Sequence, residues 1–193
     1  MTGEALLYEH EGERAVRCSL CAHRCRIEAG GRGVCGVREN RAGTLTSLVS
    51  RKVVALQCDP VEKKPFFHVL PGSRSYSIAA VGCNFRCTFC QNHEISQMPR
   101  EQGCVAGRDL EPPAIVDLAL ASSAQSIAYT YTEPTVFFEL VHETAGLARS
   151  RGLRNVLVTN GYMTREMLRL VADRIDAANV DLKAFTDSFY RRY

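Results

Sequence analysis

One short loop constrains this chain more than any other stretch. Cys83, Cys87 and Cys90 follow one another at intervals of four and three residues, directly after a run of small and apolar residues. A four-iron cube ordinarily takes four cysteine thiolates. A loop that offers only three leaves one iron free to bind a substrate, as a catalytic zinc site keeps one position open. The spacing therefore predicts an iron-sulfur cluster, and three zinc ligands or buried thiols are the alternative interpretation.

The front of the chain carries a second set of cysteines, Cys18, Cys21, Cys25 and Cys35. Four thiolates close a metal site, as in structural zinc centres, but they would equally hold a second iron-sulfur cluster. The spacing does not decide between the two, and we favour zinc narrowly. Reactive or merely buried cysteines are the remaining alternative.

The cysteine count and the amino-terminal sequence indicate a compartment. The 193 residues include nine cysteines, an odd number that argues against complete disulfide pairing and favours metal binding in a reducing environment. The first sixteen residues are polar and partly acidic, which is not typical of a secretory signal, and no apolar run is long enough to cross a bilayer. We expect a cytoplasmic protein that does not bind membranes.

The basic amino-terminal region suggests the hypothesis that the protein binds nucleic acid. Between Arg14 and Lys52 nine basic residues stand against two acidic ones, and such a surface can contact phosphates. However, no aromatic residue on which a base could stack lies between Tyr8 and Phe66. We therefore do not expect nucleic acid as a partner.

From Ser75 onward, strand-like runs alternate with helical segments, which is typical of parallel α/β architectures. The predicted strands are residues 75–81, 126–131, 154–159 and 178–182. The predicted helices begin at Pro112 and Pro113, near Val136, and after a capping Thr164. We expect three regions, a four-cysteine metal-binding region with short strands over 1–58, an extended connector over 59–74, and βα units over 75–193.

The connector and the strand exits supply further candidate residues. Lys64 and His68 could meet an anionic substrate or move protons, although surface or packing roles are the commoner alternative. Glu133 could accept hydrogen bonds from an ammonium group, or it could be an ordinary acid at a helix start. Asp181 and Lys183 share a strand face and could contact a nucleoside amino acid, or could form a simple ion pair.

Several stretches together carry a family resemblance. They are the cysteine set with its glycines, Asp59–Pro65, Pro71–Gly72, Gly82–Asn92, Tyr129–Pro134, Thr159–Gly161 and Asn179–Phe185. In this combination the chain resembles the radical S-adenosylmethionine component of the AmmeMemoRadiSam system, a group similar to pyruvate formate-lyase activating enzymes. The resemblance covers nearly the whole chain.

The resemblance implies a partial parallel βα barrel with a [4Fe-4S] cluster on the three cysteines of the loop and with S-adenosylmethionine as cofactor. It places the backbone of Phe89 near the adenine, and Thr132 and Glu133 at the methionine amino group. It also assigns Asn160, Asp181 and Lys183 to the cofactor site.

Two departures accompany the resemblance. The activating enzymes carry an aspartate before Thr-Asn-Gly, where this chain has Val158, so the cation site built by that aspartate is not expected. The family also continues through a fifth and a sixth strand, so about four βα units of a truncated barrel are expected here.

The resemblance implies an oxidoreductase. One electron, from a flavodoxin- or ferredoxin-like donor, would cleave S-adenosylmethionine to a 5′-deoxyadenosyl radical that takes a hydrogen atom from a protein or another substrate. No residue selects among substrates. The alternative from a different class is a non-catalytic metalloprotein, either a binding or an electron-transfer module.

Overall fold

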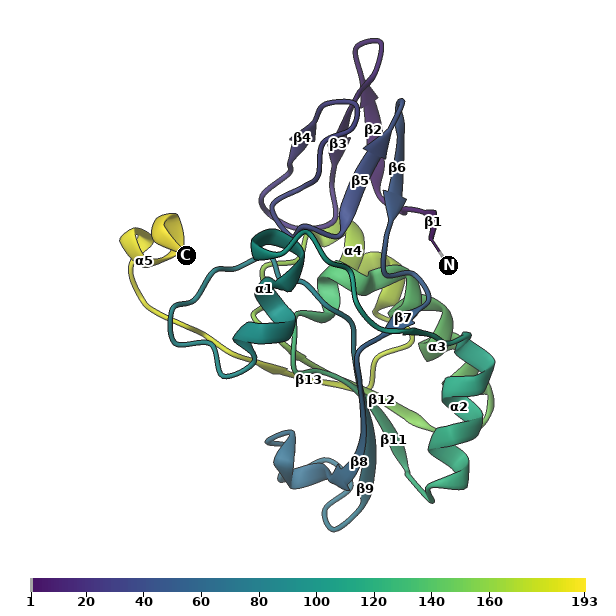
Figure 1. The fold of residues 1–193 in the computed structure, drawn as a ribbon. Helices are drawn as coiled ribbons and strands as arrows, with labels where there is room; N and C mark the ends of the chain where they lie inside the picture. Colours follow the sequence, from purple (N-terminus) through teal and green to yellow (C-terminus); the bar gives the residue numbers. More distant parts are fainter. Residues whose placement is uncertain (1) are drawn as a thin grey trace.

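The computed structural model describes residues 2–193 and is organised around one five-stranded sheet (Figure 1). Its strands are β8 (Ala55–Pro60), β9 (Arg74–Ala79), β11 (Ser126–Tyr129), β12 (Arg154–Thr159) and β13 (Ala177–Val180). They run in the order β13-β12-β11-β9-β8. Four are parallel, and β8 pairs antiparallel with β9. The protein thus has an α/β fold with a mixed sheet.

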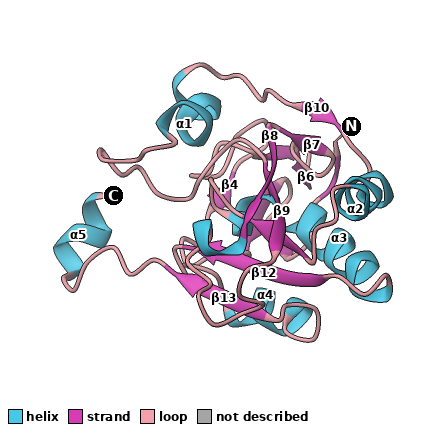
Figure 2. Cartoon of the chain, turned by 90° about the horizontal axis from the view of Figure 1, so that it is seen from below, coloured by secondary structure: helices cyan, strands magenta, loops and turns pink. Residues whose placement is uncertain are grey.

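Three helices pack on the parallel part of the sheet (Figure 2). They are α2 (Pro112–Ala121), α3 (Phe138–Ser150), which follows a 3-10 turn at Pro134–Phe137, and α4 (Arg165–Val171). Helices α1 (His93–Glu101) and α5 (Asp187–Arg192) lie away from this group. Across residues 2–193, no helix combines the length and the apolar character that crossing a membrane would require.

The amino-terminal region forms small antiparallel sheets above the helices in Figure 1. One contains β2 (Tyr8–Glu11), β3 (Ala15–Cys18) and β4 (Arg26–Ile27), and another contains β1 (Gly3–Glu4), β5 (Arg38–Arg41) and β6 (Thr44–Ser47). The short strand β7 (Lys52–Val53) pairs with β10 (Arg108–Asp109). Val37 and Leu45 belong to the same buried apolar cluster as Ile78 and Ile127 of the main sheet. The two regions therefore share one hydrophobic core.

All four predicted strands are present, and the strand at 154–159 has the predicted bounds. The other three end two residues earlier than predicted, at Ala79, Tyr129 and Val180, so Asp181 and Lys183 lie in the loop after β13 and not on a strand. Thr164 is also confirmed as a cap, since its hydroxyl accepts a hydrogen bond from the Met167 amide at 3.2 Å. The expected boundary after residue 58 has to be corrected, because β8 runs across it and pairs along its whole length with β9. Helix α1 was missed, because the polar segment around Pro99 has no long apolar face.

Candidate functional site

A cavity of about 590 Å³ opens at the carboxyl ends of the parallel strands. Its lining comes from the loops that follow β9, β11, β12 and β13, with further residues from the connector. Cys83, Cys87 and Cys90 all line it. This is the edge of a parallel α/β sheet where ligands commonly bind. The polar residues that follow the parallel strands thus meet at one edge of the sheet.

The three cysteines of the loop fit a group larger than a single ion. The thiols of the loop border the cavity of about 590 Å³. Burial raises the pKa of Cys83 to about 12, so this thiol is neutral until a metal displaces its proton. A loop that presents three thiols to such a space suits a cluster whose thiolates bind different irons.

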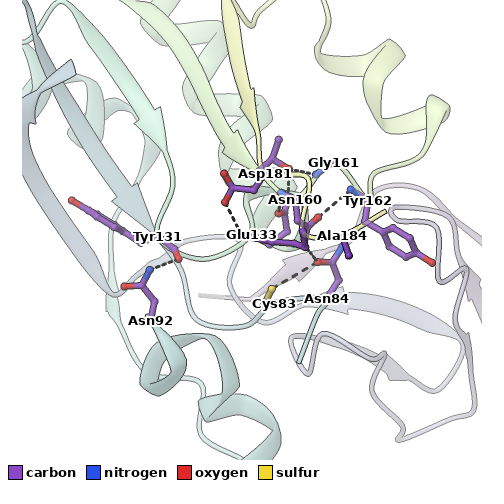
Figure 3. Close-up of polar contacts among 12 residues, drawn as sticks. Cys83, Asn84, Asn92, Tyr131, Glu133, Asn160, Gly161, Tyr162, Asp181 and Ala184 are labelled. Atoms are coloured by element: carbon purple, nitrogen blue, oxygen red, sulfur yellow. Dashed lines mark hydrogen bonds and ion pairs between the residues drawn. The ribbon is translucent and has the colours of Figure 1, made fainter. Parts of the chain in front are cut away.

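Glu133 is buried and forms hydrogen bonds with the turn that follows β12 (Figure 3). Its Oε1 accepts hydrogen bonds from the hydroxyls of Thr135 and Thr159, both at 2.6 Å, and its Oε2 accepts from the Asn160 amide at 2.8 Å. Burial raises the pKa of this carboxyl, although the hydrogen bonds oppose that change. Glu133 also lines the cavity. It therefore behaves as the acid at a helix start and faces the expected cofactor site as well.

The loop after β12 is tied directly to the cysteine loop. The Asn160 side-chain amide donates to the Asn84 side-chain oxygen at 2.7 Å, next to Cys83, as Figure 3 shows. The Thr132 hydroxyl donates to the Ala80 carbonyl at 2.7 Å, where the chain leaves β9. These contacts fix three of the loops around the cavity relative to one another.

Asp181 and Lys183 lie beside the cysteines and form an ion pair of 2.8 Å. Burial lowers the pKa of Lys183, but Asp181 and the nearby cysteines raise it by more. The ion-pair interpretation therefore describes the ligand-free geometry, and both side chains still reach the cavity. Phe89 lines the cavity too and is exposed.

The connector places its two candidate residues differently. Lys64 is buried at the cavity, whereas His68 is exposed and is not among the lining residues. The reason is local, because Val61 and Phe66 are buried on either side of Lys64 and hold this part of the connector against the sheet. The expectation that His68 acts in the site is therefore corrected.

Two residues whose side chains contact the loops of the site, Asn92 and Arg100, were not assigned a role from the sequence. The Asn92 side-chain amide donates to the Tyr131 carbonyl at 2.8 Å. Arg100 donates to the carbonyls of Cys83 at 2.8 Å and Phe85 at 3.1 Å, and it also contacts the Val34 carbonyl. Arg100 comes from the helix that was missed, so only its position in the fold reveals it.

The four amino-terminal cysteines border a second, much smaller cavity of about 20 Å³. Its other walls are mostly apolar and include Leu20, Ile27 and Val136. Burial raises the pKa of Cys21 to about 12 and that of Cys35 to about 11. The four thiols therefore border one small cavity, although within residues 2–193 no group of three or more such side chains is arranged to hold an ion in the ligand-free geometry.

Gly82 is a point of close contact between the two cysteine regions. Its φ of +100° suits glycine. A Cβ there would lie 2.8 Å from Val37 Cγ1 and 3.0 Å from the Cys35 carbonyl oxygen. The chain that enters the cysteine loop thus passes directly against the amino-terminal region.

Gly82→Ala is therefore expected to destabilise the protein by about 1–3 kcal/mol, from backbone strain and overpacking together. Urea denaturation would measure the effect. Gly152→Ala is the matched control, because Gly152 also has a positive φ of +79° but has no atom within 4 Å of the added Cβ. An equal loss in the two variants would contradict the close contact at Gly82.

Comparisons with known proteins agree with this geometry. Residues 77–193 match the radical SAM superfamily. The chain is 43% identical to uncharacterized protein MJ0808 of Methanocaldococcus jannaschii over 189 residues, which are 98% of this chain and 55% of that protein. It is 27% identical to molybdenum cofactor biosynthesis protein moc-5 of Caenorhabditis elegans over 67% of this chain and 22% of that protein.

The chain thus combines an α/β fold with a three-cysteine loop at the carboxyl edge of its sheet, an arrangement that suits an iron-sulfur cluster. The match over more than half of the chain makes the assignment specific: the protein belongs to the radical SAM superfamily. Membership implies a [4Fe-4S] cluster and S-adenosylmethionine. The chain spans about half the length of MJ0808, and a smaller share of the other relative.

Proposed function

We propose that the protein is a radical S-adenosylmethionine enzyme whose active site is the cavity at the carboxyl edge of the sheet. The observation that carries the proposal is that Cys83, Cys87 and Cys90 border the same cavity as Glu133, Asp181 and Lys183. These are three thiols for a cluster, together with the acidic and basic groups that suit an amino acid. Cys83, Cys87 and Cys90 would hold a [4Fe-4S] cluster, which would supply the one electron needed to cleave a carbon–sulfur bond of S-adenosylmethionine into methionine and a 5′-deoxyadenosyl radical able to take a hydrogen atom from a substrate.

The chain's own residues bind and orient the reactants. We assign the three cysteines of the loop to the cluster. We assign Thr132 and Glu133 to the methionine ammonium group, because both line the cavity. Asn160, whose amide donates to Glu133, is assigned to the same part of the cofactor site. Asp181 and Lys183, which form an ion pair in the ligand-free geometry, would bind the ribose hydroxyls and the carboxylate of the cofactor. The backbone of Phe89 would contact the adenine.

The finer assignment rests on the motifs. We propose that the chain represents the catalytic part of an AmmeMemoRadiSam-type enzyme, similar to the pyruvate formate-lyase activating enzymes and with the partial barrel of that group. Its electron donor would be a flavodoxin- or ferredoxin-like protein, and a protein backbone is the first substrate to examine. The connector supports this grouping, because Asp59–Pro65 is one of the stretches shared with it.

Cofactor binding tests the proposal directly. We expect S-adenosylmethionine to change the electron paramagnetic resonance spectrum of the reduced, reconstituted protein, because the open iron gains ligands. Lys183→Met should bind the cofactor more weakly, so that a higher cofactor concentration is needed to produce the same spectral change. A spectrum that is unaffected by saturating cofactor would contradict the proposed site.

We further propose that the amino-terminal cysteines hold a separate metal site. The small cavity favours a single ion such as zinc over a second cluster, since about 20 Å³ is close to the space of one water molecule. Cys18 also accepts a hydrogen bond from the buried Arg38 at 3.2 Å, which is the kind of outer contact that orients a ligand.

Cys21→Ala is expected to lose this metal while the iron of the cysteine loop is retained. Elemental analysis of purified, reconstituted protein would report zinc and iron separately. Full zinc content in the variant would contradict the four-cysteine site. If the unmodified protein contained no zinc, and more iron than the cluster of the cysteine loop accounts for, the amino-terminal cysteines would hold a second cluster.

A further inference from the structure

The cavity extends beyond the residues assigned to the cofactor, toward Tyr131 and the connector. In Figure 3 the Tyr131 side chain extends away from Cys83 and Asp181. We propose that this end of the cavity binds an anionic group of the substrate, a carboxylate or a phosphate, and that Lys64 recognises it. The inference rests on the proposed function for the identity of the cavity as an active site, but its test does not use that activity.

The burial of Lys64 is the first observation. Lys64 is only 4% exposed, yet it lines the cavity. A buried ammonium group is costly unless it is paired and hydrogen-bonded. Lysines that are mainly surface charges are rarely buried to this degree, so the position of Lys64 calls for a partner.

The partners already present leave the charge of Lys64 incompletely paired. Its Nζ lies 3.1 Å from the Tyr131 hydroxyl and 4.4 Å from the centre of the Tyr131 ring. The nearest carboxylate oxygen, Asp59 Oδ2, is 3.5 Å away, which is longer than a good hydrogen bond. The other oxygen of Asp59 pairs with Lys63 at 2.9 Å. One carboxylate thus serves two ammonium groups, and this local cluster carries one net positive charge.

The two other acidic side chains at the cavity, Glu133 and Asp181, have partners other than Lys64. Glu133 accepts from the turn after β12, and Asp181 pairs with Lys183. An ammonium group has three donors, so Lys64 can bind an anion while it keeps its contact with Tyr131. The local excess charge, burial and position in the cavity together indicate an anionic ligand.

Tyr131 supports the assignment independently. It has a φ of +64°, a conformation that is costly for a residue other than glycine and that is often found at functional sites. The Asn92 side chain holds its carbonyl, and its hydroxyl lies between Lys64 and Asp59, at 3.1 and 3.4 Å. These contacts therefore hold Tyr131 in place in the lining of the proposed anion site.

Anion binding can be measured by calorimetry, with succinate and inorganic phosphate as probes and succinamide as the uncharged counterpart of succinate. We expect one or both anions to bind and succinamide not to bind. The anion that binds more tightly distinguishes a carboxylate from a phosphate site. Equal binding of succinate and succinamide, or no binding of either anion, would overturn the proposal.

Variants test the role of Lys64. Lys64→Met should weaken anion binding by about tenfold or more, equivalent to about 1.4 kcal/mol, and Lys64→Arg should restore most of it. Asp59→Asn should strengthen binding severalfold, because Lys64 then loses its competing carboxylate. A merely structural pair predicts the opposite, namely weaker binding in Asp59→Asn. Unchanged binding in Lys64→Met would also refute the assignment.

Lys52→Met is the control, because Lys52 is outside the cavity and pairs with Asp109 at 3.4 Å. It should bind the anions as the unmodified protein does, and thermal denaturation would show that each variant is folded. Failure of the anion site and failure of the proposed function give different results. A protein that cleaves S-adenosylmethionine but binds anions independently of Lys64 refutes only the anion site, whereas Lys64-dependent binding without cleavage refutes only the enzymatic activity.

Discussion

Cys87→Ala is expected to lose most of the iron of the cysteine loop and all measurable cleavage of S-adenosylmethionine. Two thiolates cannot hold a four-iron cube as three can. Cys87 is buried at the cavity, so neither solvent nor an exposed side chain can readily replace it. Iron analysis and the absorption spectrum of the anaerobically reconstituted variant would measure the loss.

Cys104→Ala is the matched control for this experiment. Cys104 is exposed and does not line either cysteine cavity, so its removal should change neither iron content nor activity. If Cys87→Ala kept the iron content and the absorption band of the unmodified protein, the assignment of the cluster to this loop would be wrong.

Arg38→Met is expected to cause the largest loss of stability, about 3–5 kcal/mol. Arg38 is buried, and its guanidinium pairs with the buried Glu139 on α3 and donates to the Leu6 carbonyl at 2.8 Å. Burial alone would lower the pKa of Arg38, but Glu139 and Cys18 raise it above its ordinary value. Removing the arginine leaves the Glu139 carboxylate buried without its partner.

Urea denaturation of Arg38→Met and of Arg41→Met would separate this effect from a general loss of positive charge. Arg41 is exposed and pairs with Glu39 at 2.9 Å, so its removal should cost less than about 1 kcal/mol. The double variant Arg38→Met, Glu139→Gln should recover part of the loss, because the uncompensated charge is gone. A similar cost for Arg38→Met and Arg41→Met would contradict the buried ion pair.

The parallel strands were predictable because each is a short β-branched or apolar run that ends in polar residues. The antiparallel β8 was not recognised, because Asp59 and Pro60 at its end have turn chemistry and concealed a strand that continues past Cys58. Helix α1 was concealed for a similar reason, since Pro99 lies inside it. In both cases, tertiary pairing or packing overrides the local signal.

The candidate site was predictable where chemistry depends on spacing within one loop, as for Cys83, Cys87 and Cys90. It was less predictable where distant segments meet. Lys64 and His68 are equally plausible in the sequence, and only the packing of Phe66 shows that Lys64 is the one at the cavity. The Arg38–Glu139 pair joins residues 101 positions apart, so no local pattern could reveal it.

The most direct test of the central claim is an assay for 5′-deoxyadenosine. The protein would be reconstituted anaerobically with iron and sulfide, reduced chemically, and incubated with S-adenosylmethionine. We predict that 5′-deoxyadenosine and methionine form in equal amounts, at a rate that Cys104→Ala leaves unchanged and Cys87→Ala abolishes. A fully reconstituted, reduced protein that forms no 5′-deoxyadenosine would contradict the proposed enzyme and favour a non-catalytic metalloprotein.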